Sequence, residues 1–207
     1  MVYIKKNVEP NSLTEFREST PNASYDGLPT DVKNNIKNYL LVEQGYVCAY
    51  CMKQIDTKST TIEHYIAQST DSSRDLEHSN MLGVCPGNMG NPYKMQTCGC
   101  HRGNTALAIN PHVRTCIDTI SYTSDGLIVS TAVTINDDID KTLNLNVSFL
   151  ARNRKNALDK LKEELLKCND TGTWKLLVKK YIAKLSNDAR KEPYYGILLW
   201  YLRSKDT

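Results

Sequence analysis

The feature that most limits how this chain can fold is the spacing of its cysteines. Cys48-Ala-Tyr-Cys51 is a pair with a two-residue gap, and Cys85, Cys98 and Cys100 follow it. A short gap lets one tight turn present two thiolates, while distant segments supply the remaining ligands of a tetrahedral zinc site. The spacing therefore predicts a structural zinc held by Cys48, Cys51 and Cys85, with either Cys98 or Cys100 as the fourth ligand.

Other interpretations of the cysteines are weaker. The chain has seven cysteines in 207 residues, and an odd count fits a disulfide framework poorly. The Cys48–Cys51 pair could be a redox-active dithiol or two unrelated buried thiols, but a redox pair requires no later partners, whereas a zinc site does. Cys116 and Cys168 lie outside the zinc pattern, and we interpret both as small buried apolar residues.

Composition places the chain among globular proteins. Apolar residues make up 40% and charged residues 24% of the sequence, and no apolar run reaches the length of a membrane span. Residues 1–7 lack the apolar segment of a signal peptide, so we expect no membrane partner and a cytoplasmic location. The net charge of +3 is too small to indicate a nucleic-acid partner by itself.

Apolar periodicity and turn residues divide the chain into three regions. Residues 1–45 contain an arm over 1–29, predicted to be extended and partly irregular, and then a helix from Thr30 that Gly45 ends. Residues 46–112 hold five of the seven cysteines and all four histidines, and they form the candidate catalytic module.

The third region, residues 113–207, is predicted to combine a β-hairpin with helices. β-Branched alternation over 117–135 is interrupted by Ser124-Asp-Gly, which is typical of a hairpin turn. Helical spacing of apolar residues predicts helices over 147–167, 173–186 and 193–204. The aromatic stripe that includes Trp174, Tyr181 and Tyr201 is interpreted as core, with a partner-docking surface as the alternative.

Polar side chains with catalytic potential lie between the cysteine pairs. The segments Thr60-Thr-Ile-Glu63-His64 and Asn80-Met-Leu-Gly-Val-Cys85 are predicted strands, and a short helix is predicted near His101, after an insertion over 86–97. The order strand, strand, helix gives an α+β fold class. A lone His–Asn pair is often only a hydrogen-bond network, and His78 and His112 are interpreted as ordinary loop histidines.

Taken in this order, the motifs resemble those of the HNH endonuclease superfamily over residues 46–105. Across most of the chain, the sequence resembles more closely the PtuB family, the HNH subunits of Septu and retron antiphage systems. That closer resemblance rests on Gln44-Gly-Tyr-Val-Cys-Ala-Tyr-Cys51, Ile62-Glu-His64, Asn80-Met-Leu-Gly-Val-Cys-Pro-Gly-Asn88, Thr97-Cys-Gly99, Arg102-Gly-Asn104 and Ile109-Asn-Pro111.

The resemblance implies a ββα-metal (HNH) nuclease module with a structural zinc site, followed by a β-hairpin and a C-terminal α-helical region. In that module His64 would be the general base, and Glu63 and His101 would bind a catalytic Mg²⁺ or Mn²⁺. Asn80 would brace the loop that aims His64. Glu63 stands where the superfamily more usually has aspartate, and a bridging water would be compatible with its longer side chain.

The resemblance also bears on the zinc and on partners. The PtuB pattern favours Cys98 as the fourth zinc ligand, whereas Cys100 matches other HNH motifs. Arg102 and Lys94, with Arg114, are candidates for contacts with phosphates. The implied function is metal-dependent cleavage of nucleic acid, DNA or RNA, by an effector subunit held by an ATPase of the PtuA type. In retron systems a reverse transcriptase and its nucleic-acid product are further implied partners.

Two other classes of function fit parts of the pattern. A zinc-stabilised adaptor that binds nucleic acid or protein without cutting needs the four cysteines but not His64, Asn80 or His101. A cysteine redox protein predicts a reactive thiol in the Cys48–Cys51 pair and no stoichiometric zinc. The sequence does not separate a DNA substrate from an RNA substrate, because a ββα site grips backbone phosphates.

Overall fold

A computed structural model of the chain describes residues 1–168 and 170–206. Its α-helices are α1 (Asn11–Ser19), α2 (Thr30–Gln44), α3 (Cys98–Arg102), α4 (Arg114–Ile117), α5 (Val133–Asp137), α6 (Ser148–Leu166), α7 (Thr171–Asn187) and α8 (Tyr195–Arg203). Its strands are β1 (Thr61–His64), β2 (Met81–Val84), β3 (Ile120–Tyr122) and β4 (Ile128–Ser130). Short 3₁₀ turns are η1 (Ser72–Arg74), η2 (His78–Asn80) and η3 (Tyr93–Met95), and η4 (Asp138–Thr142) is a π-helical turn.

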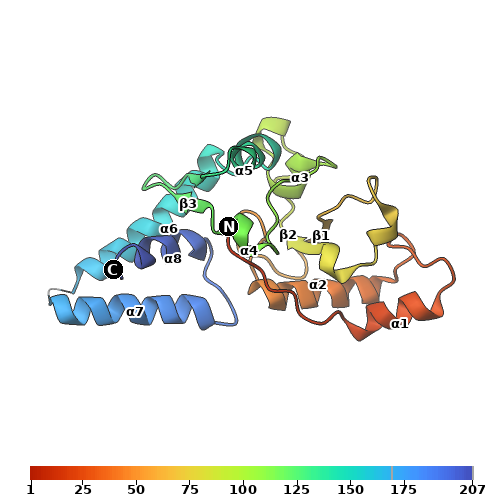
Figure 1. The fold of residues 1–207 in the computed structure, drawn as a ribbon, viewed down its shortest axis with the longest axis horizontal. Coiled ribbons are helices and arrows are strands. Elements are labelled where there is room, and N and C mark those ends of the chain that lie inside the picture. The colour runs from red at the N-terminus through yellow and green to blue at the C-terminus, as the bar shows by residue number, and fades with distance from the viewer. Residues whose placement is uncertain (169, 207) are drawn as a thin grey trace.

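The molecule is elongated, with α6, α7 and α8 at one end and α1 with α2 at the other (Figure 1). β1 and β2 lie between these ends and form an antiparallel pair in which His64 is opposite Met81. β3 and β4 form a second antiparallel pair across the turn that ends at Gly126, whose φ is +84°. The predicted mixture of helices with antiparallel strands, including the hairpin, is therefore confirmed.

The helices follow the predicted apolar periods. α2 begins at Thr30 and ends at Gly45, where φ is +65° and the backbone N–H returns to the carbonyls of Leu41 and Val42. α6, α7 and α8 match the three predicted C-terminal helices to within about two residues, the usual uncertainty of helix ends. α6 packs on the hairpin through Arg154, a fully buried side chain whose Nε donates to the carbonyl of Gly126.

Apolar side chains gather in two clusters. The larger joins the start of the chain, the Cys48–Cys51 segment, β2 and the C-terminal helices, and the smaller joins α1, α2 and β1. Trp174, Tyr181 and Tyr201 pack against the larger cluster, which confirms the interpretation of the aromatic stripe as core. The candidate site lies where both clusters meet the β1–β2 pair.

Three local predictions were wrong. The arm over 1–29 contains a helix, α1, whose amphipathic signal is weak because Leu13 is its single fully buried side chain. The ends of the region predicted as a hairpin are helical, since α4 and α5 flank the two short strands. Cys116 and Cys168 are half-buried and not fully buried.

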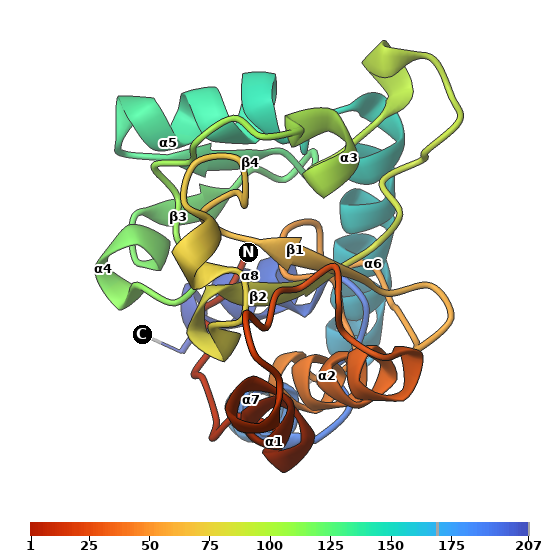
Figure 2. The same cartoon turned by 90° about the vertical axis from the view of Figure 1, so that its right-hand side faces the viewer.

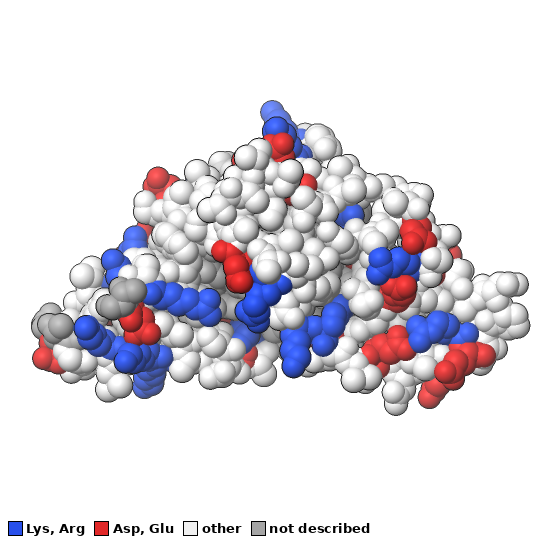
Figure 3. All heavy atoms as spheres, viewed as in Figure 1, with Lys and Arg blue, Asp and Glu red and all other residues white. Residues whose placement is uncertain are grey.

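The surface carries mixed charges. Figure 3 shows Lys and Arg interspersed with Asp and Glu on the face seen in Figure 1. On α6, Lys155 pairs with Asp159 at 2.5 Å, as expected for a solvated face with interleaved charges. Within the described part of the chain, no helix has both the length and the apolar character needed to cross a membrane.

Candidate metal centre and active site

Four buried cysteines, Cys48, Cys51, Cys85 and Cys98, come together with all their Sγ atoms within 4.8 Å of one another. The Sγ atoms of Cys48 and Cys98 are 3.8 Å apart, and those of Cys51–Cys85 and Cys85–Cys98 are 3.7 Å apart. Four thiolates bound to zinc at about 2.3 Å in a tetrahedron would be about 3.8 Å from each other. The four thiols therefore fit a zinc ion.

The local backbone explains how the first two thiols reach this position. The N–H of Met52 donates to the carbonyl of Cys48 at 3.0 Å, which closes a tight turn, and Met52 has a φ of +61°. The N–H of Ala49 donates to the carbonyl of Gly83, so the turn is attached directly to β2. Gln44 reinforces this junction from α2, because its buried amide bonds to both the N–H and the carbonyl of Gly83.

The fourth ligand is Cys98 in the geometry observed. Its N–H donates to the carbonyl of Leu143 at 2.8 Å, and its φ of +57° lies in the left-handed region that costs an L residue about 1–2 kcal/mol. Cys100 is half-buried, lies outside the cluster and donates from Sγ to Oε1 of Gln96. Spacing left open whether Cys98 or Cys100 completes the cluster, and the position of the Cys98 thiol among the other three decides for Cys98.

The thiols perturb each other strongly. Hydrogen bonds from Cys48, Cys51 and Cys98 hold the pKa of Cys85 far below its ordinary value. Thiol hydrogen bonds within the cluster, together with burial, raise the pKa values of Cys51 and Cys98. A metal ion binds cysteines as thiolates, so its binding to this cluster would release protons.

His64 lies at the end of β1 and is almost entirely buried. Its Nε2 is 2.8 Å from the backbone carbonyl of Asp75, and since a carbonyl can only accept, Nε2 carries the hydrogen. Tyr25 packs edge-on against the imidazole at 4.6 Å between ring centroids. Burial lowers the pKa of His64 below its ordinary 6.5, so the ring is neutral at pH 7 with Nδ1 unprotonated.

Asn80 fixes the loop that supplies the carbonyl bound to His64. Its Oδ1 accepts from the N–H of Ile66 at 2.7 Å, and its Nδ2 donates to the carbonyls of Ile66 and Arg74. Arg74 immediately precedes Asp75, and Ile66 lies two residues after His64. Asn80 therefore connects both ends of the 66–75 loop from a position just before β2.

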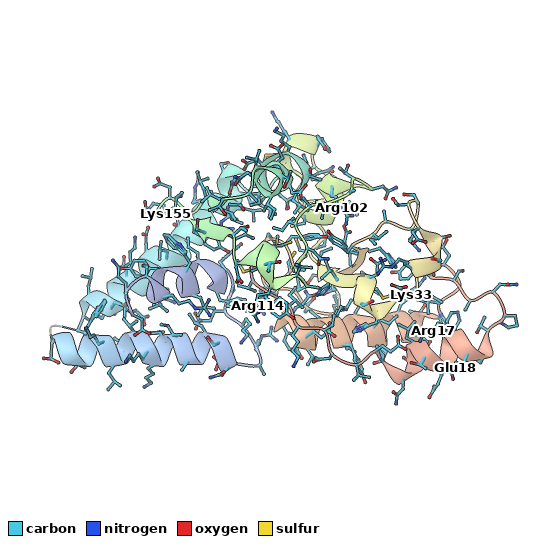
Figure 4. All side chains as sticks on the ribbon, in the orientation of Figure 1. Arg17, Glu18, Lys33, Arg102, Arg114 and Lys155 are labelled. Carbon is cyan, nitrogen blue, oxygen red and sulfur yellow. The ribbon has the colours of Figure 1, made fainter. Side chains whose placement is uncertain are left out.

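Glu63 is paired with Arg102 and is not free. Nη1 of Arg102 lies 2.7 Å from Oε1 of Glu63 and 3.0 Å from the carbonyl of His64, while Nη2 donates to the carbonyl of Tyr65. Burial raises the pKa of Glu63, and the Arg102 guanidinium opposes that shift. Arg102, on α3 (Figure 4), is 3% exposed, so the expectation that it contacts phosphates is corrected: it holds the end of β1 in place.

His101 points away from Glu63. Gly99 and Arg102 form the side of α3 that faces the Glu63 carboxylate, and a Cβ on Gly99 would lie 2.3 Å from Oε2. His101 follows Gly99 by two residues, about 200° around the helix. Its Nδ1 is 3.0 Å from the carbonyl of Thr142, and its ring stacks on Tyr93.

The two residues expected to bind a catalytic metal ion each have another partner. Among the described residues, the one group of three or more Cys, His, Asp or Glu ligand atoms close enough to share an ion is the four-cysteine cluster. Glu63 bonds to a guanidinium and His101 to a backbone carbonyl, and they lie on different sides of α3. Their joint binding of a catalytic Mg²⁺ or Mn²⁺ stays a prediction.

The remaining candidates have separate surroundings. Lys94 is exposed on the loop before α3, and Arg114 lies on α4 (Figure 4), where its guanidinium stacks over Tyr3 at 4.2 Å from the ring centroid. His78 is buried with its Nε2 3.7 Å from a carboxylate oxygen of Glu43. Nδ1 of His112 lies 3.1 Å from a backbone carbonyl near the start of the chain.

Sequence reasoning missed the residues that position the site from a distance. Asp75 acts through its backbone carbonyl, which no residue type can signal. Tyr25 comes from the arm, and its N–H donates to the carboxylate of Asp75 at 2.8 Å, so the arm packs on the His64 loop. Arg102 was noticed, but its basic character suggested the surface and not the interior.

A strand histidine braced by an asparagine beside a four-cysteine cluster is the arrangement that the motifs predicted for HNH endonucleases. Comparison with known proteins confirms that resemblance: the chain is similar to an Escherichia coli protein described as "Retron Ec83 putative HNH endonuclease". The two are 29% identical over 108 residues, which cover 46% of this chain and 42% of the relative, less than half of its length. No protein-family model matches the chain.

Proposed function

We propose that this chain is a nuclease that hydrolyses phosphodiester bonds of nucleic acid, with His64 as the general base. The observation that carries the proposal is the bond from Nε2 of His64 to the carbonyl of Asp75, which leaves Nδ1 as an unprotonated acceptor. The similarity to a retron HNH endonuclease supports the reaction class. The strand, strand, helix order of β1, β2 and α3 supports assignment to the ββα-metal fold.

The chemistry assigned to His64 is the activation of water. A neutral imidazole with a pKa below 6.5 accepts a proton from water through Nδ1 while Nε2 stays bonded to Asp75. The imidazolium that forms gains from the same carbonyl, because hydrogen bonding from Nε2 to Asp75 raises the pKa of His64 against the effect of burial. His64 can therefore take a proton and return it without turning its ring.

Asn80 and Arg102 are positioning residues in this proposal. Asn80 holds the loop that carries the Asp75 carbonyl, and Arg102 holds the backbone on both sides of His64. Neither side chain needs to touch the substrate. Loss of either would let the imidazole rotate or shift, and misplacement of a catalytic group by about 1 Å can lower a rate about 100-fold.

The test is cleavage by the purified full-length chain and its variants, each with Mg²⁺ or Mn²⁺. Substrates are supercoiled plasmid, single-stranded DNA and total cellular RNA. His64→Ala should abolish cleavage while zinc content stays stoichiometric. His112→Gln is the matched control, because it changes a histidine outside the proposed site and should leave cleavage intact. Full activity in His64→Ala would refute the assignment.

The second candidate is a zinc-stabilised adaptor without catalytic activity. It is favoured by the partners of the two expected metal ligands, because Glu63 pairs with Arg102 and His101 bonds to the carbonyl of Thr142. The two candidates differ in cells: toxicity of the wild type that His64→Ala removes supports the nuclease. Equal effects of the two proteins on growth support the adaptor.

We further propose that the chain works as the effector of an antiphage defence complex in the cytoplasm. The retron description of the relative and the resemblance to the PtuB family support this setting and an ATPase of the PtuA type as partner. Cleavage profiles of total nucleic acid from cells that express the chain with and without such an ATPase would test it. Identical profiles in all cells would contradict control by the ATPase.

A further inference from the structure

The segment 86–97, which separates the last two cysteines of the cluster, forms a projecting and well-braced loop. Figure 2 shows it standing out beside α3. The N–H of Thr97 donates to the carbonyl of Gly87, and the Asn88 amide reaches the carbonyl of Met95. Asn144 donates to the carbonyls of both Lys94 and Gln96. These bonds fix the conformation of a loop that has little core of its own.

Tyr93 is the most unusual side chain on this loop. Its ring stacks on His101 with 4.0 Å between centroids and 21° between planes, yet it remains 64% exposed. Its hydroxyl donates to the backbone carbonyl of His101, and the His101 ring is itself held by the carbonyl of Thr142. One face of the tyrosine is therefore supported, and the other is open to solvent.

The segment that carries Tyr93 is free of acidic residues. Along the chain no Asp or Glu occurs between Glu77 and Asp118, and the neighbouring Lys94 is exposed, while Asp138 and Asp140 lie on η4, which packs against α3. Met89 and Met95 are exposed on the same loop and add apolar edges. A supported aromatic face next to a lysine is what proteins use to stack a base and contact its phosphate.

The loop is also connected to the candidate active site. His101, which supports Tyr93, lies on α3 two residues after Gly99, against which the Glu63 carboxylate packs. Glu63 directly precedes His64 on β1. The short helix α3 thus lies between Tyr93 and the strand that bears the proposed base.

We propose that Tyr93, backed by His101, is a stacking platform for an unpaired base of single-stranded nucleic acid, with Lys94 contacting the adjacent phosphate. This rests on the proposed function for its substrate class. In this proposal His101 supports the inner face of the Tyr93 ring. The platform selects single strands or loops, because a base within a duplex has no free face to offer.

The test is equilibrium binding of fluorescein-labelled 12-nucleotide DNA and RNA single strands, measured by anisotropy in the His64→Ala background so that nothing is cut. Tyr93→Ala should weaken binding about 5- to 150-fold, the loss of one base stack. Tyr93→Phe keeps the ring and should stay within about twofold of the parent. Tyr39→Ala, at an exposed tyrosine on α2, is the control and should bind as the parent does.

Two further measurements separate stacking from charge. A 2-aminopurine placed along the strand should lose fluorescence on binding to the parent and not to Tyr93→Ala. Lys94→Gln should reduce the slope of log affinity against log salt by about 0.7, the contribution of one phosphate contact on a single strand. A blunt duplex should bind with the same affinity to Tyr93→Ala and to the parent.

The platform is overturned if Tyr93→Ala binds single strands as the parent does, or if Tyr93→Phe is as weak as Tyr93→Ala. It is equally overturned if the parent binds no single strand, or if Tyr93→Ala loses only the binding of an ATPase partner. Its failure is distinct from failure of the proposed function. Cleavage that depends on His64 while Tyr93→Ala binds normally rejects the platform alone, and binding without any cleavage rejects the nuclease alone.

Discussion

Replacing one cysteine of the cluster tests the metal centre most directly. Cys98→Ser and Cys100→Ser exchange the same atoms two residues apart on α3, but Cys98 alone belongs to the four-thiol cluster. The Sγ of Cys98 lies 3.8 Å from that of Cys48 and 3.7 Å from that of Cys85. The Sγ of Cys100 instead donates to Oε1 of Gln96, at 3.2 Å.

The expected magnitudes differ widely. Structural zinc contributes about 10–16 kcal/mol of binding free energy that is also folding free energy, so one of four ligands accounts for about 3 kcal/mol or more. The left-handed backbone of Cys98, which costs about 1–2 kcal/mol, would lose its compensation by the metal. Cys98→Ser should therefore remove much of a total stability of about 5–15 kcal/mol, and Cys100→Ser should change it by less than about 1 kcal/mol.

The assay measures zinc and stability together. Zinc content is determined by elemental analysis after dialysis, and the free energy of unfolding is determined by urea denaturation with and without added zinc. Wild type and Cys100→Ser should retain about one zinc per chain, with a urea midpoint that falls when the metal is chelated. Stoichiometric zinc and unchanged stability in Cys98→Ser, or loss of zinc in Cys100→Ser, would refute the assignment.

Three further predictions follow from the buried charged and titratable groups. Arg102→Met should destabilise the fold by about 3–5 kcal/mol, because it leaves the Glu63 carboxylate buried and unpaired, and adding Glu63→Gln should recover part of the loss in urea denaturation. The folded-state pKa of His78, about 4, lies below its ordinary 6.5, so the unfolded chain binds more protons than the folded chain between these values. The free energy of unfolding therefore decreases as the pH is lowered through this range. The free energy of unfolding of the wild type, measured by urea denaturation, should decrease by about 2 kcal/mol from pH 7.5 to pH 5, and that of His78→Gln should decrease much less. For the nuclease, kcat/KM should decline on the acid side with a midpoint below 6.5, because burial lowers the pKa of His64; a midpoint above 6.5 would argue against this base.

The Glu63 carboxylate is held by two residues of α3, and His101 is not one of them. Gly99 stands directly against the Glu63 carboxylate, and Arg102, one turn of α3 further on, supplies the positive charge beside it. A Cβ at this position would lie 2.3 Å from Oε2 of Glu63. Gly99→Ala should therefore shift the end of the Glu63 side chain.

Features that depend on neighbouring residues could be predicted from the sequence. Residue type at a turn directly indicates its backbone conformation. This applies to the Cys48–Cys51 turn, to the end of α2 at Gly45 and to the hairpin turn at Gly126. The C-terminal helices could also be predicted, because each has a long run of apolar residues at helical spacing. α1 was missed because one fully buried leucine gives too little period to recognise.

Features that depend on distant residues required the tertiary structure. The sequence by itself determined that cysteines with the spacing of zinc ligands bracket a strand with His64, since ligand spacing and strand patterning are properties of short segments. It could not decide between Cys98 and Cys100, since the choice depends on a bond from Cys98 to Leu143, 45 residues away along the chain. Nor could it show that Arg102 turns inward to Glu63 while His101 turns outward to Tyr93, because the direction of a side chain on a short helix is set by what packs around it.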